Sequence, residues 1–327
     1  MKNGEYAYNK SYSVGYDFGS VKRLDRYDMG ALSTLYICFA LKKHDSDFIK
    51  AYFDSLKWYR EIYMISAEGA RNHGLLNVPT DEFFDAKHYI PQDLAEQRKI
   101  ANFMIALERR IEAQQSLVDN LKKYKRGLLN KVFSNTDEKI YPTVYLSEVA
   151  DFLQGLTYSP SDVANAGHLV LRSSNIQNGT LSFDDCVYVD KSIPESLQVK
   201  CADVIMCVRN GSKSLVGKTA LIPIDMPKTT WGAFMMIVRS KLNDTYIFHY
   251  LNSQMFFSQV FKDTGTATIN QITKGILNEC RLPLPPVEER KKISKMLSTF
   301  DAKIYNAERT LYALMETRKA LLQQLFI

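Results

Sequence analysis

The sequence lacks the features that mark membrane-spanning and disulfide-stabilised proteins. No apolar run is long enough to span a membrane, so we expect no membrane contact. The five cysteines are scattered, form no CxxC pair and follow no signal peptide, which favours reduced thiols and a cytoplasmic location. With 46% apolar and 24% charged residues, the 327-residue chain has the composition of an ordinary globular protein of two domains.

Motifs for catalysis are missing as well. The five histidines have no metal-ligand spacing with cysteines or acidic residues. The Asp/Asn-Pro-Pro-aromatic run of adenine methyltransferases is absent, and no carboxylate pair is flanked by lysine as in metal-dependent nucleases. The sequence therefore indicates a chain that is not an enzyme and holds no metal or cofactor of its own.

One stretch, Gly211 to Thr219, resembles a phosphate-binding GxxxxGK[ST] loop. Five residues rather than four separate its glycines, although the cradle of backbone N–H groups depends on that spacing. Leu221 and Ile222 continue an apolar strand pattern where such a loop would begin a helix. Nucleotide binding is therefore disfavoured but stays an alternative. Binding of a nucleotide that is lost in the Lys218→Ala variant would establish it.

An internal repeat dominates the chain: residues 95–133 return as residues 288–326, shifted by 193 positions. Both copies place apolar residues alternately four and three apart, the spacing that buries one stripe of a helix against a partner helix. The stripe is interrupted at the same places, Gln114 with Ala307 and Lys125 with Arg318, which indicates a duplication. The first copy's stripe comprises Ile100, Met104, Leu107, Ile111, Gln114, Val118, Leu121, Lys125, Leu128 and Val132. The second comprises Ile293, Leu297, Phe300, Ile304, Ala307, Leu311, Leu314, Arg318, Leu321 and Leu325.

Each copy predicts a helix about 60 Å long that cannot bury its stripe alone. We expect the two helices to pack as an antiparallel coiled coil; the alternative is that each packs on its own globular lobe. The predicted fold is α+β, with two globular lobes, the first of them partial, separated by the two long helices in a pseudo-two-fold repeat. The expected boundaries are a partial first lobe at 1–89, a long helix at 90–134, a linker at 135–144, a second lobe at 145–283 and a second long helix at 284–327.

The two lobes share sequence features. NKSYSVG near the start resembles RNGSKSLVG around 209–217, and both lobes contain a helical pattern rich in Phe and Tyr, at 47–66 and 245–261. A hairpin turn is expected at Asn178-Gly179. Residues 141–201 have no counterpart in the first lobe, which we therefore expect to be an N-terminally shortened copy.

The net charge of +6 is concentrated on the predicted helices. Residues 95–134 carry nine basic against four acidic residues, and 286–327 carry eight against five. The lobes are close to neutral, with twelve basic against thirteen acidic residues in 1–94 and twelve against twelve in 141–283. Basic helices between neutral lobes suit a polyanionic partner, although a solvated helix face is the simpler interpretation.

Polar loops containing glycine are the candidate contact sites. Arg and Asn can bond bidentately to guanine and adenine edges, whereas Ser and Lys suit phosphates. Several such loops beside basic helices favour nucleic acid over ordinary surface turns. The candidate DNA-binding residues are Asn9, Lys10, Ser11, Tyr12, Arg172, Ser173, Ser174, Asn175, Arg209, Asn210, Ser212, Lys213, Ser214, Thr266, Thr268 and Asn270.

At this point the chain resembles the specificity subunit of Type I restriction–modification systems. The residues that carry the resemblance are LAEQRKIANFMIALERRI and PPVEERKKISKMLSTFDAKI, the helix ends KRGLLNKVF and RKALLQQLF, and RNGSKSLVGKTALI. The resemblance implies a non-catalytic DNA reader with two target recognition domains and two conserved spacer helices. The shortened first lobe departs from that pattern and leaves open whether residues 1–89 read DNA.

The resemblance also implies partners. These are double-stranded DNA, two methyltransferase subunits that would carry S-adenosylmethionine, and a translocase–nuclease subunit. Two alternatives stay open: a coiled-coil scaffold that binds methyltransferase but no DNA, and self-association of two chains, each offering its intact lobe.

Overall fold

The computed structural model describes residues 1–66, 76–134, 141–262 and 271–326. The chain divides into two compact units: Met1–Val118 with Asn306–Ile327 form unit 1, and Asp119–Tyr305 form unit 2. Both units mix helices and strands, which confirms the α+β prediction. Among the described helices, none is both long and apolar enough to cross a bilayer.

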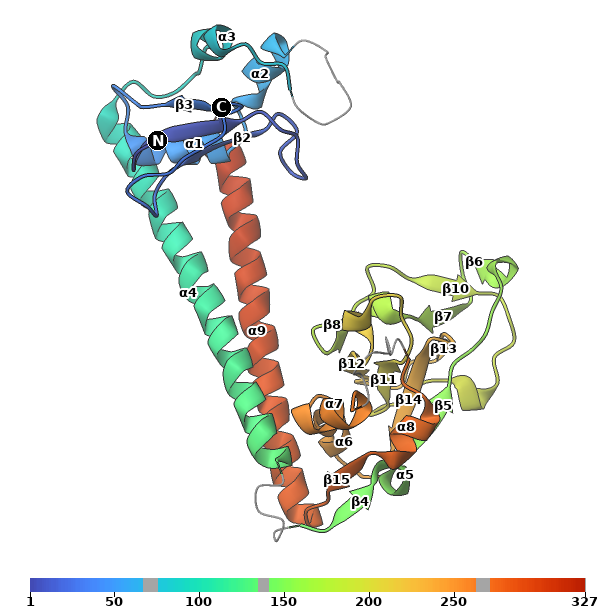
Figure 1. Ribbon diagram of the computed structural model, residues 1–327. Coiled ribbons are helices and arrows are strands. Elements are labelled where there is room, and N and C mark those ends of the chain that lie inside the picture. Colours follow the sequence, from blue (N-terminus) through green and yellow to red (C-terminus); the bar gives the residue numbers. More distant parts are fainter. Residues whose placement is uncertain (67–75, 135–140, 263–270, 327) are drawn as a thin grey trace. The chain divides into compact units, whose positions relative to one another are not determined.

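Unit 1 is built on a three-stranded antiparallel sheet. Its central strand β1 (Tyr6–Asn9) pairs with β2 (Ser20–Arg23) and with β3 (Ile37–Phe39). Helix α1 (Ser46–Asp54) lies on this sheet (Figure 1), where the Tyr6 hydroxyl donates to the carbonyl of Ser46 at 2.6 Å. Buried aromatic rings fill the space between sheet and helix, and Tyr8 packs edge-on against Trp58.

The helix expected over 47–66 is two helices, so that prediction is wrong in its continuity. Helix α1 is followed by α2 (Tyr59–Ile65), and Leu56 between them has a φ of 61°. The Ser55 hydroxyl and the Trp58 indole donate to carbonyl oxygens of the last turn of α1. These bonds end the helix because they take acceptors that the next turn would use. Unit 1 also contains α3 (Thr80–Asp85).

The described residues of unit 2 form two four-stranded sheets and two smaller strand pairs. The first sheet has the order β13 (Thr229–Trp231), β7 (His168–Leu171), β10 (Val187–Val189), β6 (Val163–Ala164). The second has the order β12 (Thr219–Leu221), β11 (Val204–Cys207), β14 (Met235–Ser240), β5 (Ala150–Gln154). The pairs are β4 (Thr143–Tyr145) with β15 (Arg281–Pro283), and β8 (Ile176–Gln177) with β9 (Thr180–Leu181). Only β13 and β7 pair in parallel among these described strands.

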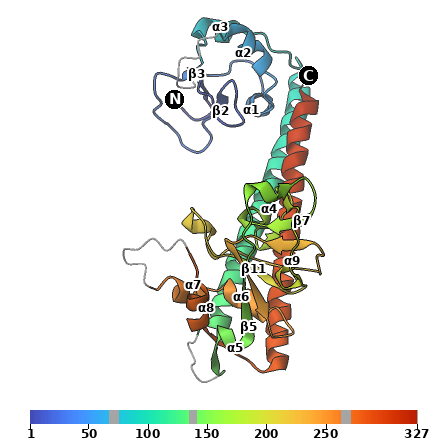
Figure 2. The ribbon, with the colours of Figure 1, turned by 90° about the vertical axis from the view of Figure 1, so that its right-hand side faces the viewer.

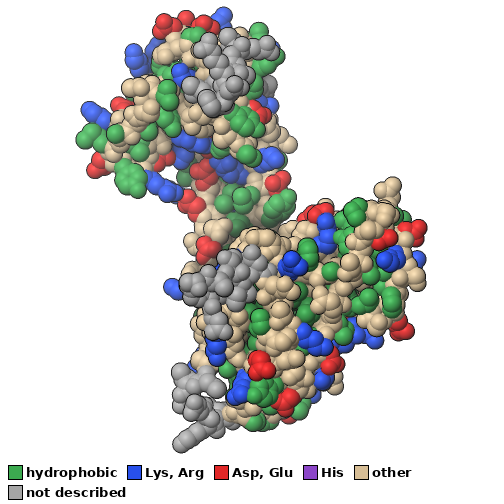
Figure 3. Space-filling model, turned by 45° about the vertical axis from the view of Figure 1, so that its right-hand side comes forward, with side chains coloured by type: hydrophobic (Ala, Val, Ile, Leu, Met, Phe, Trp, Pro, Cys, Tyr) green, Lys and Arg blue, Asp and Glu red, His purple; other side chains and the backbone are tan. Residues whose placement is uncertain are grey.

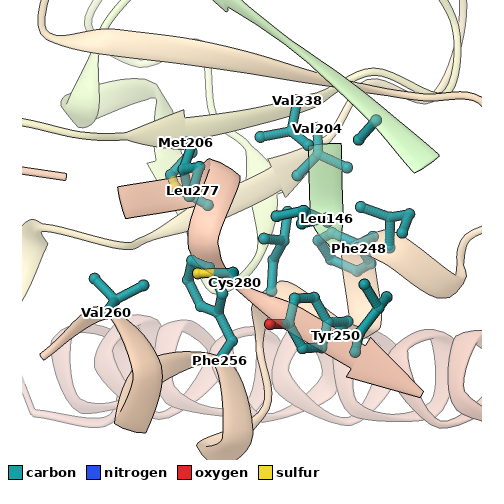
Figure 4. Close-up of a cluster of buried hydrophobic side chains, with 14 of the residues drawn as sticks. Leu146, Val204, Met206, Val238, Phe248, Tyr250, Phe256, Val260, Leu277 and Cys280 are labelled. Carbon is teal, nitrogen blue, oxygen red and sulfur yellow. The ribbon is translucent and has the colours of Figure 1, made fainter. Parts of the chain in front are cut away.

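Short helices cover the second sheet of unit 2 and enclose its main core (Figure 4). They are α5 (Leu146–Val149), α6 (Tyr246–Leu251), α7 (Gln254–Val260) and α8 (Lys274–Glu279). The helix expected over 245–261 is again divided, here at Asn252 and Ser253. Asn252 donates to the carbonyl of Phe248, and the Ser253 hydroxyl both donates to the carbonyl of Tyr250 and caps α7.

The hairpin turn expected at Asn178-Gly179 is confirmed. These two residues join β8 to β9 with φ angles of 51° and 79°. Both values are positive, as a tight turn of the primed type requires, and Asn and Gly tolerate this conformation best.

The two long helices, α4 (Leu94–Phe133) and α9 (Val287–Leu325), run side by side in each unit (Figures 1 and 2). All twenty residues predicted for the two apolar stripes are buried or half-buried. In unit 1, Gln114 contacts Ala307 and Glu108 contacts Arg318. In unit 2, Tyr124 contacts Phe300 and Lys125 contacts Asp301. Rising numbers on α4 meet falling numbers on α9 within unit 1, so the segments there are antiparallel and the coiled-coil prediction is confirmed.

Each unit holds the end of one long helix by the same contacts. In unit 2, the Phe133 ring lies 5.1 Å from Tyr246 and 5.7 Å from Tyr250, between ring centroids. In unit 1, Phe326 lies 5.5 Å from Phe48 and 5.7 Å from Tyr52. Phe133 and Phe326 are 193 positions apart, so the duplication extends from sequence to side-chain packing.

Candidate nucleic-acid interface

Two of the predicted contact loops of unit 2 line one pocket of about 730 Å³. The first loop begins at Arg172, directly after β7, and forms the 3-10 helix η2 (Ser173–Asn175). The second begins at Arg209, directly after β11 and Val208. The fold thus brings together Arg172, Ser173, Ser174, Arg209 and Asn210, which the sequence separates by up to 38 positions. Apolar and aromatic side chains complete the lining, among them Leu156, Tyr158, Val163, Phe234 and Met235.

Asn175 has a different place from its predicted one. Its side chain has no exposed surface, and its Oδ1 accepts from the backbone N–H of Arg172 at 2.9 Å. Its Nδ2 donates to the carbonyls of Ser182 and Asp185, both at 3.0 Å. With its amide fully used in this way, Asn175 shapes the loop and does not reach a base edge in this structure.

Asn210 joins the two loops. Its Nδ2 donates to the Ser173 hydroxyl at 3.2 Å, and its Oδ1 accepts from the backbone N–H of Ser212 at 2.9 Å. The bond to Ser173 holds the two loops together. The bond to the Ser212 backbone forms a short turn closed by the Asn210 side chain, at the point where the strand ends.

Arg209 stands at the mouth of the pocket. Its guanidinium carbon lies 5.2 Å from the centroid of the Phe234 ring, within the range of a cation–π contact. The N–H groups of Val208 and Arg209 both donate to the carbonyl of Phe234, so two residues of one strand face one residue of the other. Such a bulge re-aims the side chain that follows a strand. Arg209 is exposed and keeps its charge available.

The rest of the second loop is exposed and polar. Lys213 begins the 3-10 helix η4 (Lys213–Leu215), and the hydroxyls of Ser212 and Ser214 lie 2.9 Å apart. Ser214 also lines a smaller pocket of about 320 Å³ with Lys218 and Thr219. Thr219 begins strand β12 rather than a helix, as the sequence pattern predicted, so the stretch does not have the local structure of a phosphate-binding P-loop.

Three predicted contact residues, Thr266, Thr268 and Asn270, lie outside the described residues. The next residue, Gln271, forms an antiparallel bridge with Arg209. That bridge places the start of the described segment after the gap beside the second contact loop.

The predicted contact loop of unit 1 has the same local turn as its counterpart. Asn9 accepts from the backbone N–H of Ser11 at 3.0 Å, as Asn210 does from Ser212. Lys10 accepts through its carbonyl from the N–H of Leu76, and Tyr12 is exposed. The resemblance between the lobes that the sequence predicted is therefore visible in the hydrogen bonding of this turn.

Basic side chains of helix α4 in unit 2 surround a surface hollow of about 440 Å³. Its lining residues are Asp119, Lys122, Lys123 and Arg126. On the face seen in Figure 3, by contrast, basic and acidic side chains are interspersed. Charge alone therefore does not single out a contact surface on that face, and the placement of individual side chains matters more.

Sequence reasoning missed the other lining residues of the main pocket, among them Tyr158, Asp185 and Phe234. Phe234 could have been found, because it begins the apolar, strand-like run of residues 234–238 that follows Gly232 and Ala233. Asp185 could not, because its role depends on the distance between its carboxylate and Arg172, which are 13 residues apart in the chain.

Comparison with known proteins identifies the family. The family described as "Type I restriction modification DNA specificity domain" matches residues 140–315, which is more than half of the chain. The matched range contains both loops of the main pocket. The chain belongs to this family.

Two curated relatives are each 29% identical to the chain: the StySPI specificity subunit of Salmonella potsdam over 173 residues and the EcoKI specificity subunit of Escherichia coli over 166 residues. The matches cover 50% and 49% of this chain but 37% and 36% of those proteins, so the chain matches little more than a third of their length. The MjaVIII specificity subunit of Methanocaldococcus jannaschii is 24% identical over 297 residues, covering 83% of this chain and 68% of that protein.

Solved structures show the same fold. The S subunit of a Type I restriction-modification system from M. genitalium aligns with a TM-score of 0.62 and 17% identity, covering 100% of this chain and 84% of that one. A chain from a structure of a type I R-M system aligns with a TM-score of 0.62 and 16% identity, covering 99% and 82%.

Proposed function

We propose that this chain is the DNA-specificity subunit of a cytoplasmic Type I restriction–modification complex and binds double-stranded DNA through the loops of unit 2. The observation that carries the proposal is the convergence of Arg172, Arg209 and three polar residues on one pocket, from the ends of two strands that belong to different sheets. Arginine and serine side chains at strand ends are suited to base edges and phosphates respectively. The family membership and the specificity subunits among the relatives support the same reading.

The side chains of the loops suit two different kinds of DNA contact. The exposed Ser212, Lys213 and Ser214 suit the phosphate backbone, which fixes the position of the protein on the duplex without reading sequence. The pocket arginines offer the planar donors that recognise paired acceptors on a base. In this proposal the chain supplies recognition only, and the chemistry belongs to its partners.

The long helices would supply the partner surface. Their apolar stripes face each other, yet the outer faces also carry exposed large apolar side chains. In unit 1 these include Phe103, Leu117, Tyr312 and Met315, and in unit 2 they include Tyr124. Exposed apolar side chains among charged ones are typical of protein-binding surfaces. We propose that two methyltransferase subunits, which carry S-adenosylmethionine, dock here and that a translocase–nuclease subunit joins them.

The test is to sequence adenine methylation sites in cells that make this chain together with its cognate methyltransferase subunit. A split motif in two parts would mean that both lobes read bases. A palindromic motif would mean that two chains pair and each reads one half through unit 2. Absence of any motif, with methyltransferase still bound in a pull-down, would replace DNA recognition by a scaffold role.

A further inference from the structure

Asp185 faces Arg172 across the rim of the main pocket. It lies in the loop between β9 and β10, and its Oδ2 accepts from Nη2 of Arg172 at 2.8 Å. The arginine side chain is 34% exposed and the aspartate side chain 62% exposed, so both remain accessible from the pocket side. The pair therefore lies where a DNA base would meet the protein, not in the core.

A buried amide holds this ion pair from below. Asn175 accepts from the backbone N–H of Arg172 and donates to the carbonyl of Asp185. Together with the ion pair, these bonds close a ring through Arg172, Asn175 and Asp185. An exposed ion pair contributes little to stability by itself. A pair whose two backbones are tied to the same buried side chain has a defined geometry, and the guanidinium is oriented by it.

The oriented guanidinium retains unused donors. Arginine has five N–H donors, and the described residues accept from one of them, through Asp185. Its Nε is buried and has no hydrogen-bond partner within the described part of the chain. Because this Nε is buried, the donors left for a ligand belong to the terminal nitrogens Nη1 and Nη2, and such a planar group matches two acceptors held in one plane. The O6 and N7 atoms of guanine are such a pair, and arginine is their commonest partner.

We propose that Asp185 is a positioning residue that braces Arg172 to read one guanine of the target, and so determines specificity at that base pair. This inference rests on the proposed DNA-binding function and adds the residue, the base and the mechanism. Asp185 touches Arg172 rather than the guanine. If Asp185 acted only by repelling phosphates, removal of its charge would strengthen binding to all duplexes alike. If it braces Arg172, removal of its charge reduces the preference for guanine.

The experiment uses the full chain and a pool of randomised duplex DNA. Selection by the wild-type chain yields the preferred motif, and competition with duplexes altered at each motif position measures the discrimination at every base. The variants are Asp185→Asn, Asp185→Glu and Arg172→Lys. The matched control is Asp184→Asn, which removes the same charge one residue away. Asp184 is exposed, and its carboxylate accepts from the Ser182 hydroxyl. Circular dichroism and thermal melting verify that each variant is folded.

We expect Asp185→Asn and Arg172→Lys to lose about tenfold or more of the discrimination at the same guanine position and to keep it elsewhere. Asp185→Glu should retain part of it, and Asp184→Asn should keep all of it. The salt dependence of binding should stay unchanged in Asp185→Asn, because no phosphate contact is removed. Stronger binding of Asp185→Asn to all duplexes alike, or an unaltered guanine preference, overturns the inference while leaving the proposed function intact. A wild-type chain that binds no duplex and selects no motif overturns both.

Discussion

Gln114 donates a hydrogen bond from its side-chain amide to the carbonyl oxygen of Ala307 at 2.9 Å, and these two residues are each other's counterparts in the 193-residue repeat. In an antiparallel pair of equivalent helices, counterparts meet only at the midpoint of the pairing. The small alanine side chain leaves its backbone open to the longer amide. The first interruption of the apolar stripe is therefore a polar contact at the centre of the repeat within unit 1.

The second interruption is also a pair of counterparts. Lys125 contacts Asp301 in unit 2, and Arg318 contacts Glu108 in unit 1 at 2.9 Å. The two acidic residues, Glu108 and Asp301, are 193 positions apart, and so are the two basic residues, Lys125 and Arg318.

Asp301→Leu should destabilise unit 2 by about 1–3 kcal/mol, because it leaves the largely buried Lys125 without its acidic partner. The double variant with Lys125→Met should recover most of that loss. Urea denaturation measures both, with the exposed Lys123→Met as a control expected to change stability by less than about 0.5 kcal/mol. A double variant no more stable than the single one would contradict this account.

Phe133 and Phe326 should each stabilise their own unit. Both are fully or nearly fully buried between two aromatic rings, so replacement by alanine should cost about 3–5 kcal/mol. Amide hydrogen exchange separates the units: Phe133→Ala should accelerate exchange in α6 and Phe326→Ala in α1. Phe103→Ala, on the exposed side of α4, is the control for loss of a phenylalanine ring. Equal acceleration in both units from either variant would show that the anchors do not act locally.

Arg209→Ala should weaken binding to the preferred duplex by about 1–3 kcal/mol and relax the choice of base at one position. Arg209→Lys should keep the charge but lose the planar donors. The control is Lys200→Ala, an exposed basic residue that does not line the pocket. Competition binding at fixed salt measures the effect. If Arg209→Ala weakens binding equally on all sequences and Arg209→Lys restores it, Arg209 contacts phosphate rather than a base.

His249 should make unit 2 sensitive to mild acid. Complete burial, with a contribution from Lys125, lowers the pKa of His249 to about 3. Its Nε2 lies 3.1 Å from the Ser298 hydroxyl and 3.3 Å from that of Thr245, and its Nδ1 lies 3.7 Å from Asp301, whose own pKa is raised by burial.

The sign follows from these values. The histidine is neutral when folded but gains a proton near pH 6.5 when unfolded, so its contribution to stability is full above about pH 6.5 and falls as the pH drops toward 3. The expected slope approaches about 1.4 kcal/mol per pH unit below pH 6. The free energy of opening of α6 is obtained from amide exchange at pH 7 and pH 5 after correction for the intrinsic exchange rate at each pH. It should fall less between pH 7 and pH 5 in His249→Gln than in the wild type. Equal falls would assign the acid sensitivity to another group.

The long helices could be predicted from the sequence in detail, because a seven-residue pattern and its repeat both depend only on residue spacing. The breaks at Leu56 and at Asn252–Ser253 could not. Apolar spacing continues through both, and the helices end because particular hydroxyl, amide and indole groups take the carbonyls of the preceding turn. The parallel pairing of β13 with β7 joins residues about 60 positions apart, and no local pattern encodes it.

The candidate site was predictable to the level of its loops. The sequence assigned Arg172 and Arg209 to polar loops, and in the structure these loops follow strands β7 and β11. Whether a polar side chain faces solvent or the interior depends on its three-dimensional neighbours, and Asn175 shows this: it has the same chemistry as a base reader but all its donors and acceptors are used by the backbone.

The packing of Phe326 has a consequence for the order in which the chain acquires structure during synthesis. Unit 2 is one uninterrupted segment, Asp119–Tyr305, and can assemble as soon as that segment has left the ribosome. Unit 1 combines residues 1–118 with residues from Asn306 onward, so its aromatic core lacks Phe326 until the segment after unit 2 has been made. Unit 1 thus begins before unit 2 in the chain but gains its full core after unit 2 has been made, and until then its apolar residues lack the cover that the last turns of α9 provide.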